Sequence, residues 1–327
     1  MKKAILATLA YYDALGLPLT ILEVWHYLVN PGRWGEAEIG NLTGVEVELE
    51  QMVSERQIET RAGFYFLPGR LELVEQRLAK QKIAEAKWKK VKRYLWLVQS
   101  LPYIEGLFAS GSLGLGFMKP GSDLDILVIT RAQRIWLGRL LLTAAMGLLG
   151  VRRRKNVLAA PGKVCLNHYI ATDALSIRWH SLYTAQLYAH LWPVYLKDKK
   201  LLEDFNQANN WIQKDYLSNW AGVEINRQRY LRESRVQQAF GTSAERLLEL
   251  TGLGWLLNQL AKKIQLARLA RDHSDKGIGR ITTTDQELEF HPHSPETAIL
   301  DKYNETIGHL GQFGEYIEQD SGLRLLT

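Results

Sequence analysis

One stretch indicates the fold and the site of this chain: Leu107-Phe-Ala-Ser-Gly-Ser-Leu-Gly-Leu-Gly-Phe-Met-Lys-Pro-Gly-Ser-Asp-Leu-Asp-Ile-Leu-Val-Ile-Thr130. It joins a Gly-Ser turn to two carboxylates, Asp123 and Asp125, at the start of an apolar run. Side chains two residues apart on a strand point to the same face, so both acids can aim at one point. The alternating apolar residues then point the other way, into a core: Leu124, Ile126 and Val128.

Two neighbouring carboxylates repel each other unless a cation lies between them. Mg²⁺ suits this position because it binds one or two carboxylates together with phosphate oxygens. The backbone amides of a glycine-rich turn approach phosphates closely, and the Ser112 hydroxyl adds a donor. The pattern therefore predicts a site for phosphoryl or nucleotidyl transfer. The alternative interpretation is a glycine-rich turn followed by a strand with solvated acids.

This combination resembles the DNA polymerase β-type nucleotidyltransferase superfamily, and in particular its minimal nucleotidyltransferase domains. In that signature Gly-Ser is followed, after a similar gap, by Asp-x-Asp, as in residues 111–125. The resemblance implies that Asp123 and Asp125 are catalytic and coordinate Mg²⁺ or Mn²⁺. It also implies that an acceptor hydroxyl attacks the α-phosphorus of ATP or another nucleoside triphosphate, with release of pyrophosphate.

The same resemblance assigns the nucleotide contacts. Gly111 and Ser112 would hold the β- and γ-phosphates, and Lys119 and Ser122 on the following loop would add phosphate contacts. The acceptor stays open between RNA, a protein hydroxyl and a small molecule.

Active members of the superfamily usually carry a third acid on a later strand. The candidate strand here, Lys163-Val-Cys-Leu-Asn-His-Tyr-Ile170, contains no acid. We expect Asn167 at the third catalytic position, with Cys165 on the same side, although Asp173 just beyond the strand is an alternative. His168 is either a base or a core residue. A second function therefore stays open, that of a catalytically degenerate protein that binds nucleotide or nucleic acid and acts as a regulator.

The positive charge of the chain is concentrated around the decisive stretch. Residues 1–77 carry 7 Lys/Arg against 11 Asp/Glu, whereas residues 78–155 carry 15 against 4. Such a field favours a polyanionic partner. Part of it is the run Arg152–Lys155, which is either a phosphate-binding patch or a charged cap at a helix C-terminus.

Compartment and membrane contact are constrained by two features. A single cysteine among 327 residues excludes an intramolecular disulfide and fits a reducing, cytoplasmic compartment. The apolar run 140–151 is too short to span a bilayer and predicts a buried helix, with a membrane-lying helix as the alternative. We therefore expect no membrane partner.

The chain is expected to be an α+β protein of three parts. Residues 1–77 resemble a winged helix, with three helices followed by a hairpin. Residues 78–180 would hold a linker helix and the nucleotidyltransferase core with a small mixed sheet, and residues 181–327 a mostly helical domain. In the last part we expect one helix over 244–269 and a hairpin over 281–290.

DNA binding by the winged-helix-like part is not expected, because its third helix carries mostly acids. These acids are Glu46, Glu48, Glu50 and Glu55. The long helix predicted over 71–98 is basic, with Trp88 and Trp96 interleaved. It is either a solvated linker whose tryptophans pack on the next domain or a surface for single-stranded nucleic acid.

Overall fold

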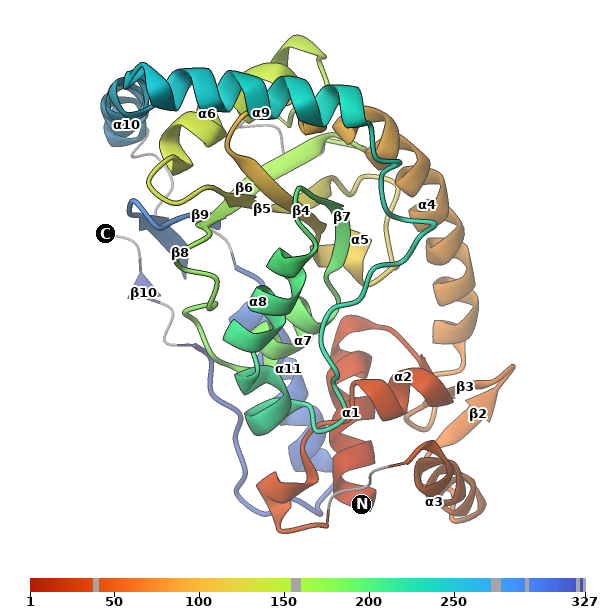
Figure 1. The fold of residues 1–327 in the computed structure, drawn as a ribbon. Helices are drawn as coiled ribbons and strands as arrows, with labels where there is room; N and C mark the ends of the chain where they lie inside the picture. The colour runs from red at the N-terminus through yellow and green to blue at the C-terminus, as the bar shows by residue number, and fades with distance from the viewer. Residues whose placement is uncertain (38–40, 154–159, 272–277, 292–293, 322–323, 326–327) are drawn as a thin grey trace.

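The computed structural model describes residues 1–37, 41–153, 160–271, 278–291, 294–321 and 324–325. These residues form a mixed α+β fold, as expected (Figure 1). Its centre is a seven-stranded sheet with the order β10-β8-β9-β6-β5-β4-β7, and a three-stranded sheet lies near the N-terminus. Within the described ranges, no helix is both long and apolar enough to cross a bilayer.

The central strands are the ones expected around the decisive stretch: β4 (Ile104–Ala109), β5 (Leu124–Thr130) and β6 (Val164–Ala171). β5 and β6 run parallel, whereas every other neighbouring pair in this sheet is antiparallel. Segment 181–327, expected to be mostly helical, also contributes strands to the same sheet. They are β7 (Trp192–Leu196), β8 (Ile278–Thr283), β9 (Glu287–His291) and β10 (Arg324–Leu325), of which β8 and β9 form the expected hairpin.

Helices cover both faces of the large sheet (Figure 1). One face packs against α4 (Glu72–Leu95), α6 (Ile135–Leu148) and α10 (Leu253–Arg271), and the other against α1, α7, α8 and α11. Because side chains alternate along β5, Ile126 and Val128 enter the first core while Leu127 and Ile129 enter the second. The central strand is therefore buried on both sides, and only its N-terminal end carries acids.

The N-terminal part has the expected order of three helices and a hairpin. Its elements are α1 (Lys2–Leu15), β1 (Leu19–Thr20), α2 (Ile21–His26), a 3₁₀ turn (Pro31–Trp34), α3 (Leu42–Ser54), β2 (Glu59–Arg61) and β3 (Phe64–Phe66). A capping box begins α2, since the Thr20 hydroxyl accepts from the Glu23 amide and Glu23 accepts from the Thr20 amide.

Helix α1 joins this part to the rest of the protein. Its residues 4–13 are all buried, on every side of the helix. The rings of Tyr11 and Tyr303 lie 6.2 Å apart, and the Tyr12 hydroxyl donates to Gln186 over 2.6 Å. Helices α1, α2 and α3 therefore share one hydrophobic core with the C-terminal helices.

The remaining helices are α5 (Gly111–Gly114), α7 (Leu182–Ala189), α8 (Lys200–Ala208), α9 (Arg235–Leu250) and α11 (Glu296–His309), with a 3₁₀ turn at Trp96–Ser100 and a π-helical turn at Ile212–Tyr216. The prediction of a single helix over 244–269 is wrong, because the helix is interrupted between α9 and α10 at Gly252, whose φ is +71°. Trp88 packs in the core as expected of a linker helix, whereas Trp96 is half exposed.

Candidate active site

The Gly-Ser turn and the acids of β5 are in direct contact. β4 leads into the turn, and the Ser110 amide donates to the Asp125 carbonyl over 3.0 Å, which ties the turn to the start of β5. Gly111 has a φ of +57°, and a Cβ built on it would lie 2.7 Å from Oδ2 of Asp125. Glycine is therefore required here both by the backbone conformation and by the carboxylate beside it.

The turn presents free hydrogen-bond donors. Among the described residues, neither the amides of Gly111, Ser112 and Leu113 nor the Ser112 hydroxyl have a hydrogen-bond acceptor. The turn is held from behind, since a Cβ on Gly114 would lie 2.5 Å from the His190 carbonyl oxygen. These donors are thus fixed in place and available to an anion.

Three side chains converge beside the turn. Asp123, Asp125 and Cys165 each offer an atom within 4.8 Å of the others. Asp125 lies opposite Cys165 in the β5–β6 register, and an irregularity in that register follows directly, before Leu127 pairs with His168.

The charge of Asp125 is unfavourable in this position. Burial and the nearby charge of Asp123 raise the pKa of Asp125 to about 7, although Arg153 and hydrogen bonds from Cys165 and Asn167 oppose the shift. Asn167 therefore lies within hydrogen-bonding distance of Asp125. Arg153 and these hydrogen bonds therefore do not fully offset the charge of the two acids, which leaves them able to bind a further cation.

The guanidinium group of Arg153 is a cation beside the two acids. Its Nη1 lies 2.5 Å from Oδ2 of Asp123 and 3.8 Å from the Cys165 sulfur. Its own amide donates to the Val164 carbonyl, which fixes the start of the side chain next to β6. The sequence placed Arg153 only in a general basic run, of which Arg154 and Lys155 lie outside the described residues.

Lys119 and Ser122 form the turn that leads into the acids. The Lys119 amide donates to the Ser122 hydroxyl over 3.1 Å, and the Lys119 side chain is exposed. Lys87 of α4 holds this loop, donating to the carbonyl oxygens of Lys119 (2.9 Å), Pro120 (3.2 Å) and Ser122 (2.5 Å). This role of Lys87 was not predicted from the sequence, although Lys87 borders the apolar stripe of its helix.

Asp173 is excluded as the third acid, so that alternative was wrong. It follows the end of β6, where Ala171 pairs with Thr130 at the far end of β5. At about 3.3 Å per residue, Ala171 lies roughly 20 Å along β6 from Cys165, and Asp173 follows in the turn beyond it. The acids of the site are at the opposite end of the same strand pair.

The donor set fits a hard divalent cation. Two carboxylates are ligands that Mg²⁺ and Mn²⁺ accept. Burial and the charges of Asp125 and Asp123 raise the pKa of the Cys165 thiol, so it stays neutral near pH 7 and is a poor ligand for a hard ion. Among the residues that the structure describes, no third carboxylate joins this group.

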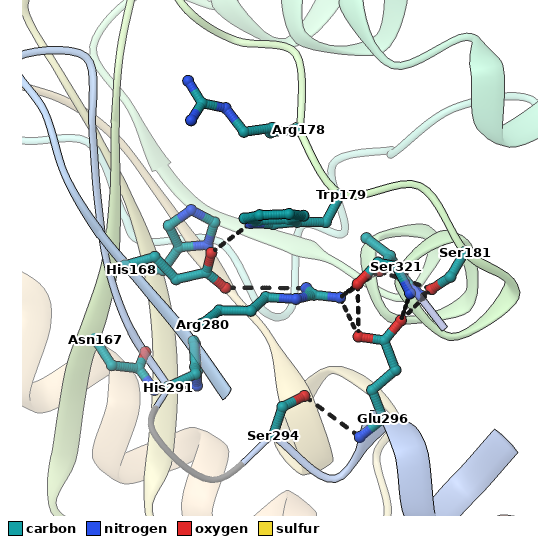
Figure 2. Close-up of polar contacts among 12 residues, drawn as sticks. Asn167, His168, Arg178, Trp179, Ser181, Arg280, His291, Ser294, Glu296 and Ser321 are labelled. Carbon is teal, nitrogen blue, oxygen red and sulfur yellow. Dashed lines mark hydrogen bonds and ion pairs between the residues drawn. The ribbon is translucent and has the colours of Figure 1, made fainter. Parts of the chain in front are cut away.

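A second polar cluster lies further along β6, and its acids pair with neighbouring side chains (Figure 2). His168 is buried, with its two ring nitrogens 3.2 Å from Glu287 and 2.8 Å from the Tyr188 hydroxyl. Glu289 accepts from the Trp179 indole over 3.1 Å and lies 3.9 Å from Arg280, which also pairs with Glu296. This network joins β6, β8, β9 and α11, and it makes His168 a core residue.

The chain was also compared with known proteins. No protein-family model matches it, and neither a curated protein nor a solved structure is significantly similar to it.

Proposed function

We propose that this chain is a Mg²⁺-dependent nucleotidyltransferase of the DNA polymerase β type. It would move a nucleoside monophosphate from ATP or another nucleoside triphosphate to an acceptor hydroxyl of RNA, a protein or a small molecule. The observation that carries the proposal is the contact between Gly111 and Asp125. It makes the free donors of the turn and the acid pair one site, in which a polyphosphate and a divalent cation can neutralise each other.

Each part of the site has a distinct role in this reaction. The amides at 111–113 and the Ser112 hydroxyl bind the terminal phosphates, because they are donors without acceptors. Asp123 and Asp125 would hold Mg²⁺, which when bound neutralises the charge that develops on the phosphates. Arg153 stabilises Asp123, and Lys87 fixes the loop that carries it. The acceptor hydroxyl then attacks the α-phosphorus and loses its proton to water, and the bond to the pyrophosphate oxygen breaks.

The test is transfer of label from α-labelled nucleoside triphosphates in the presence of Mg²⁺ or Mn²⁺. We expect Asp123→Asn and Asp125→Asn each to lose labelling of an acceptor. Asp173→Asn is the matched control, since it removes an exposed acid at the other end of the same strand pair. Equal labelling by the wild type and both site variants contradicts the assignment.

A second function is favoured by the composition of the third position. Asn167 and Cys165 stand where an acid is expected, and neither supplies a negative charge near neutral pH. The chain would then bind nucleotide without turning it over and act as a regulator. Tight binding of nucleotide without transfer, unchanged in Asn167→Asp, supports this second function over the first.

For the N-terminal part we propose a role in contacting a protein or positioning the substrate. Its exposed acids Glu46, Glu50 and Glu55 support this role over DNA binding, because they would repel phosphates. A cytoplasmic location is proposed from the single cysteine.

A further inference from the structure

Helices α9 and α10 turn their polar sides inward. The buried residues of α10 include Asn258 and Gln265, which bind the backbone of α6. Asn258 accepts from the Leu137 amide over 3.0 Å, and Gln265 donates to the Trp136 carbonyl over 2.8 Å. On α9 the buried positions are Gly241 and Glu245. Packing against the protein therefore uses small and polar residues of both helices, together with Leu266 and Leu269 of α10.

The outward sides of the same helices are apolar. On α9 the residues Val236, Phe240, Leu247 and Leu250 form one helical stripe, and Leu250 is 86% exposed. On α10 the residues Leu253, Leu256, Leu257, Leu260 and Ile264 form a second stripe, whereas Trp255 is exposed on another side of the helix. We call these two sets the α9–α10 face. Apolar surface gathered in this way marks a contact with another molecule.

The charges of the two helices are segregated as well. The acids of α9 pair with the protein, Glu245 with Lys197 and Arg131, and Glu249 with Arg134. α10 contains no acid. The exposed cations of the two helices are Arg235, Arg246, Lys263 and Arg268, and none of them forms an ion pair with the described residues.

The separation of acids and cations on the two helices indicates which kind of partner fits the α9–α10 face. A second copy seated symmetrically on the α9–α10 face would bring the unpaired cations of both copies together without acids between them. An anionic surface is complementary to them, and an amphipathic helix with cations beside an apolar face is the form that binds lipid interfaces. Both helices lie along the outer edge of the molecule, away from the N-terminal part, with α10 seen end-on next to α9 (Figure 1).

We propose that the α9–α10 face docks on a membrane surface of anionic phospholipid. The apolar stripes enter the headgroup region and the four cations contact lipid phosphates, so the helices lie on the bilayer and do not cross it. The proposal replaces the expectation of no membrane partner, which was drawn from the lack of a run long enough to span a bilayer. The inference does not rest on the proposed enzymatic function.

The test is sedimentation of the full chain with vesicles of phosphatidylcholine, alone or mixed with phosphatidylglycerol. We expect binding to the mixed vesicles, weakened by salt, and little binding to the neutral ones. The pair of changes Leu247→Ser and Leu250→Ser should weaken binding by at least about tenfold. Arg246→Gln and Lys263→Gln should each weaken it by about fivefold.

Matched controls lie on other surfaces. Val47→Ser on α3 removes an apolar side chain that is 60% exposed, and Lys82→Gln removes an exposed cation of α4. Both controls should bind as the wild type does. Absence of wild-type binding to the mixed vesicles overturns the proposal. So does a wild-type dimer in analytical ultracentrifugation that becomes monomeric in the Leu247→Ser, Leu250→Ser variant, because a second copy would then cover the face.

Discussion

The backbone of Gly111 and the carboxylate of Asp125 touch: a Cβ on Gly111 would lie 2.7 Å from Oδ2 of Asp125. Because no real Cβ approaches an oxygen so closely, Gly111→Ala must move either the turn or the acid. We expect this variant to lose nucleotide transfer by at least about a hundredfold, since misplacement of a reacting group by 1 Å has an effect of that order. Transfer of labelled nucleotide measures it.

Gly116→Ala is the matched control for backbone strain. Gly116 has a φ of +65°, close to that of Gly111, but no atom lies within 4 Å of a Cβ built on it. Both variants should lose about 1 kcal/mol of stability from the left-handed backbone. If both also lose transfer to the same extent, the contact with Asp125 does not explain the requirement for glycine.

Asp125→Asn should change how stability depends on pH. The pKa of Asp125 is raised to about 7 in the folded protein, and it is close to 4 in an unfolded chain. The folded state therefore binds this proton more tightly, and Asp125 destabilises the protein increasingly from about pH 4 to about pH 7. Above pH 7, without divalent metal, the Asn variant should be more stable than the wild type by roughly 2–4 kcal/mol.

Urea unfolding at pH 8 and at pH 4 measures this difference, which should nearly vanish at the lower pH. Asp173→Asn, at an exposed acid, should follow the wild type at both values. A wild type that is as stable as Asp125→Asn at pH 8 would show that the charge of Asp125 is already neutralised.

The sequence predicted the elements of the site because their signals are local. The alternation from Leu124 to Val128 located β5. The prediction for Asp173 was wrong because it did not take the direction of the strands into account. A strand–helix–strand crossover makes β5 and β6 parallel, so the residue after β6 lies at the far end of the strand pair, away from Asp123 and Asp125.

Other parts of the site depend on long-range packing. Arg153 reaches Asp123 because its backbone is bonded to β6, and Lys87 reaches Ser122 because α4 packs across the loop. No local pattern in either segment encodes its partner. The strand order, with β9 beside β6, likewise depends on which apolar faces meet in the folded chain.

Arg153→Gln should strengthen binding of Mn²⁺ without nucleotide. The guanidinium contacts Asp123 at 2.5 Å and competes with a divalent ion for the same oxygen. Loss of an ion pair worth about 1 kcal/mol should tighten Mn²⁺ binding by roughly fivefold, as measured by electron paramagnetic resonance. Arg152→Gln is the neighbouring control and should bind as the wild type does. Weaker Mn²⁺ binding by Arg153→Gln would show that Arg153 organises the acids and does not compete for them.

Lys87→Met should loosen the loop that carries Asp123. The ammonium group binds three carbonyl oxygens at 119, 120 and 122, and methionine keeps the length of the side chain without the donors. Because hydrogen bonds to a charged group contribute about 1.5–3 kcal/mol each and the freed carbonyls regain water, we expect a loss of roughly 2–3 kcal/mol in urea unfolding. Mn²⁺ binding should weaken with it, since the loop positions Asp123.

Lys89→Met, at an exposed position of the same helix, should stay within about 0.5 kcal/mol of the wild type. A Lys87→Met variant as stable as Lys89→Met would mean that the loop holds its shape without the lysine.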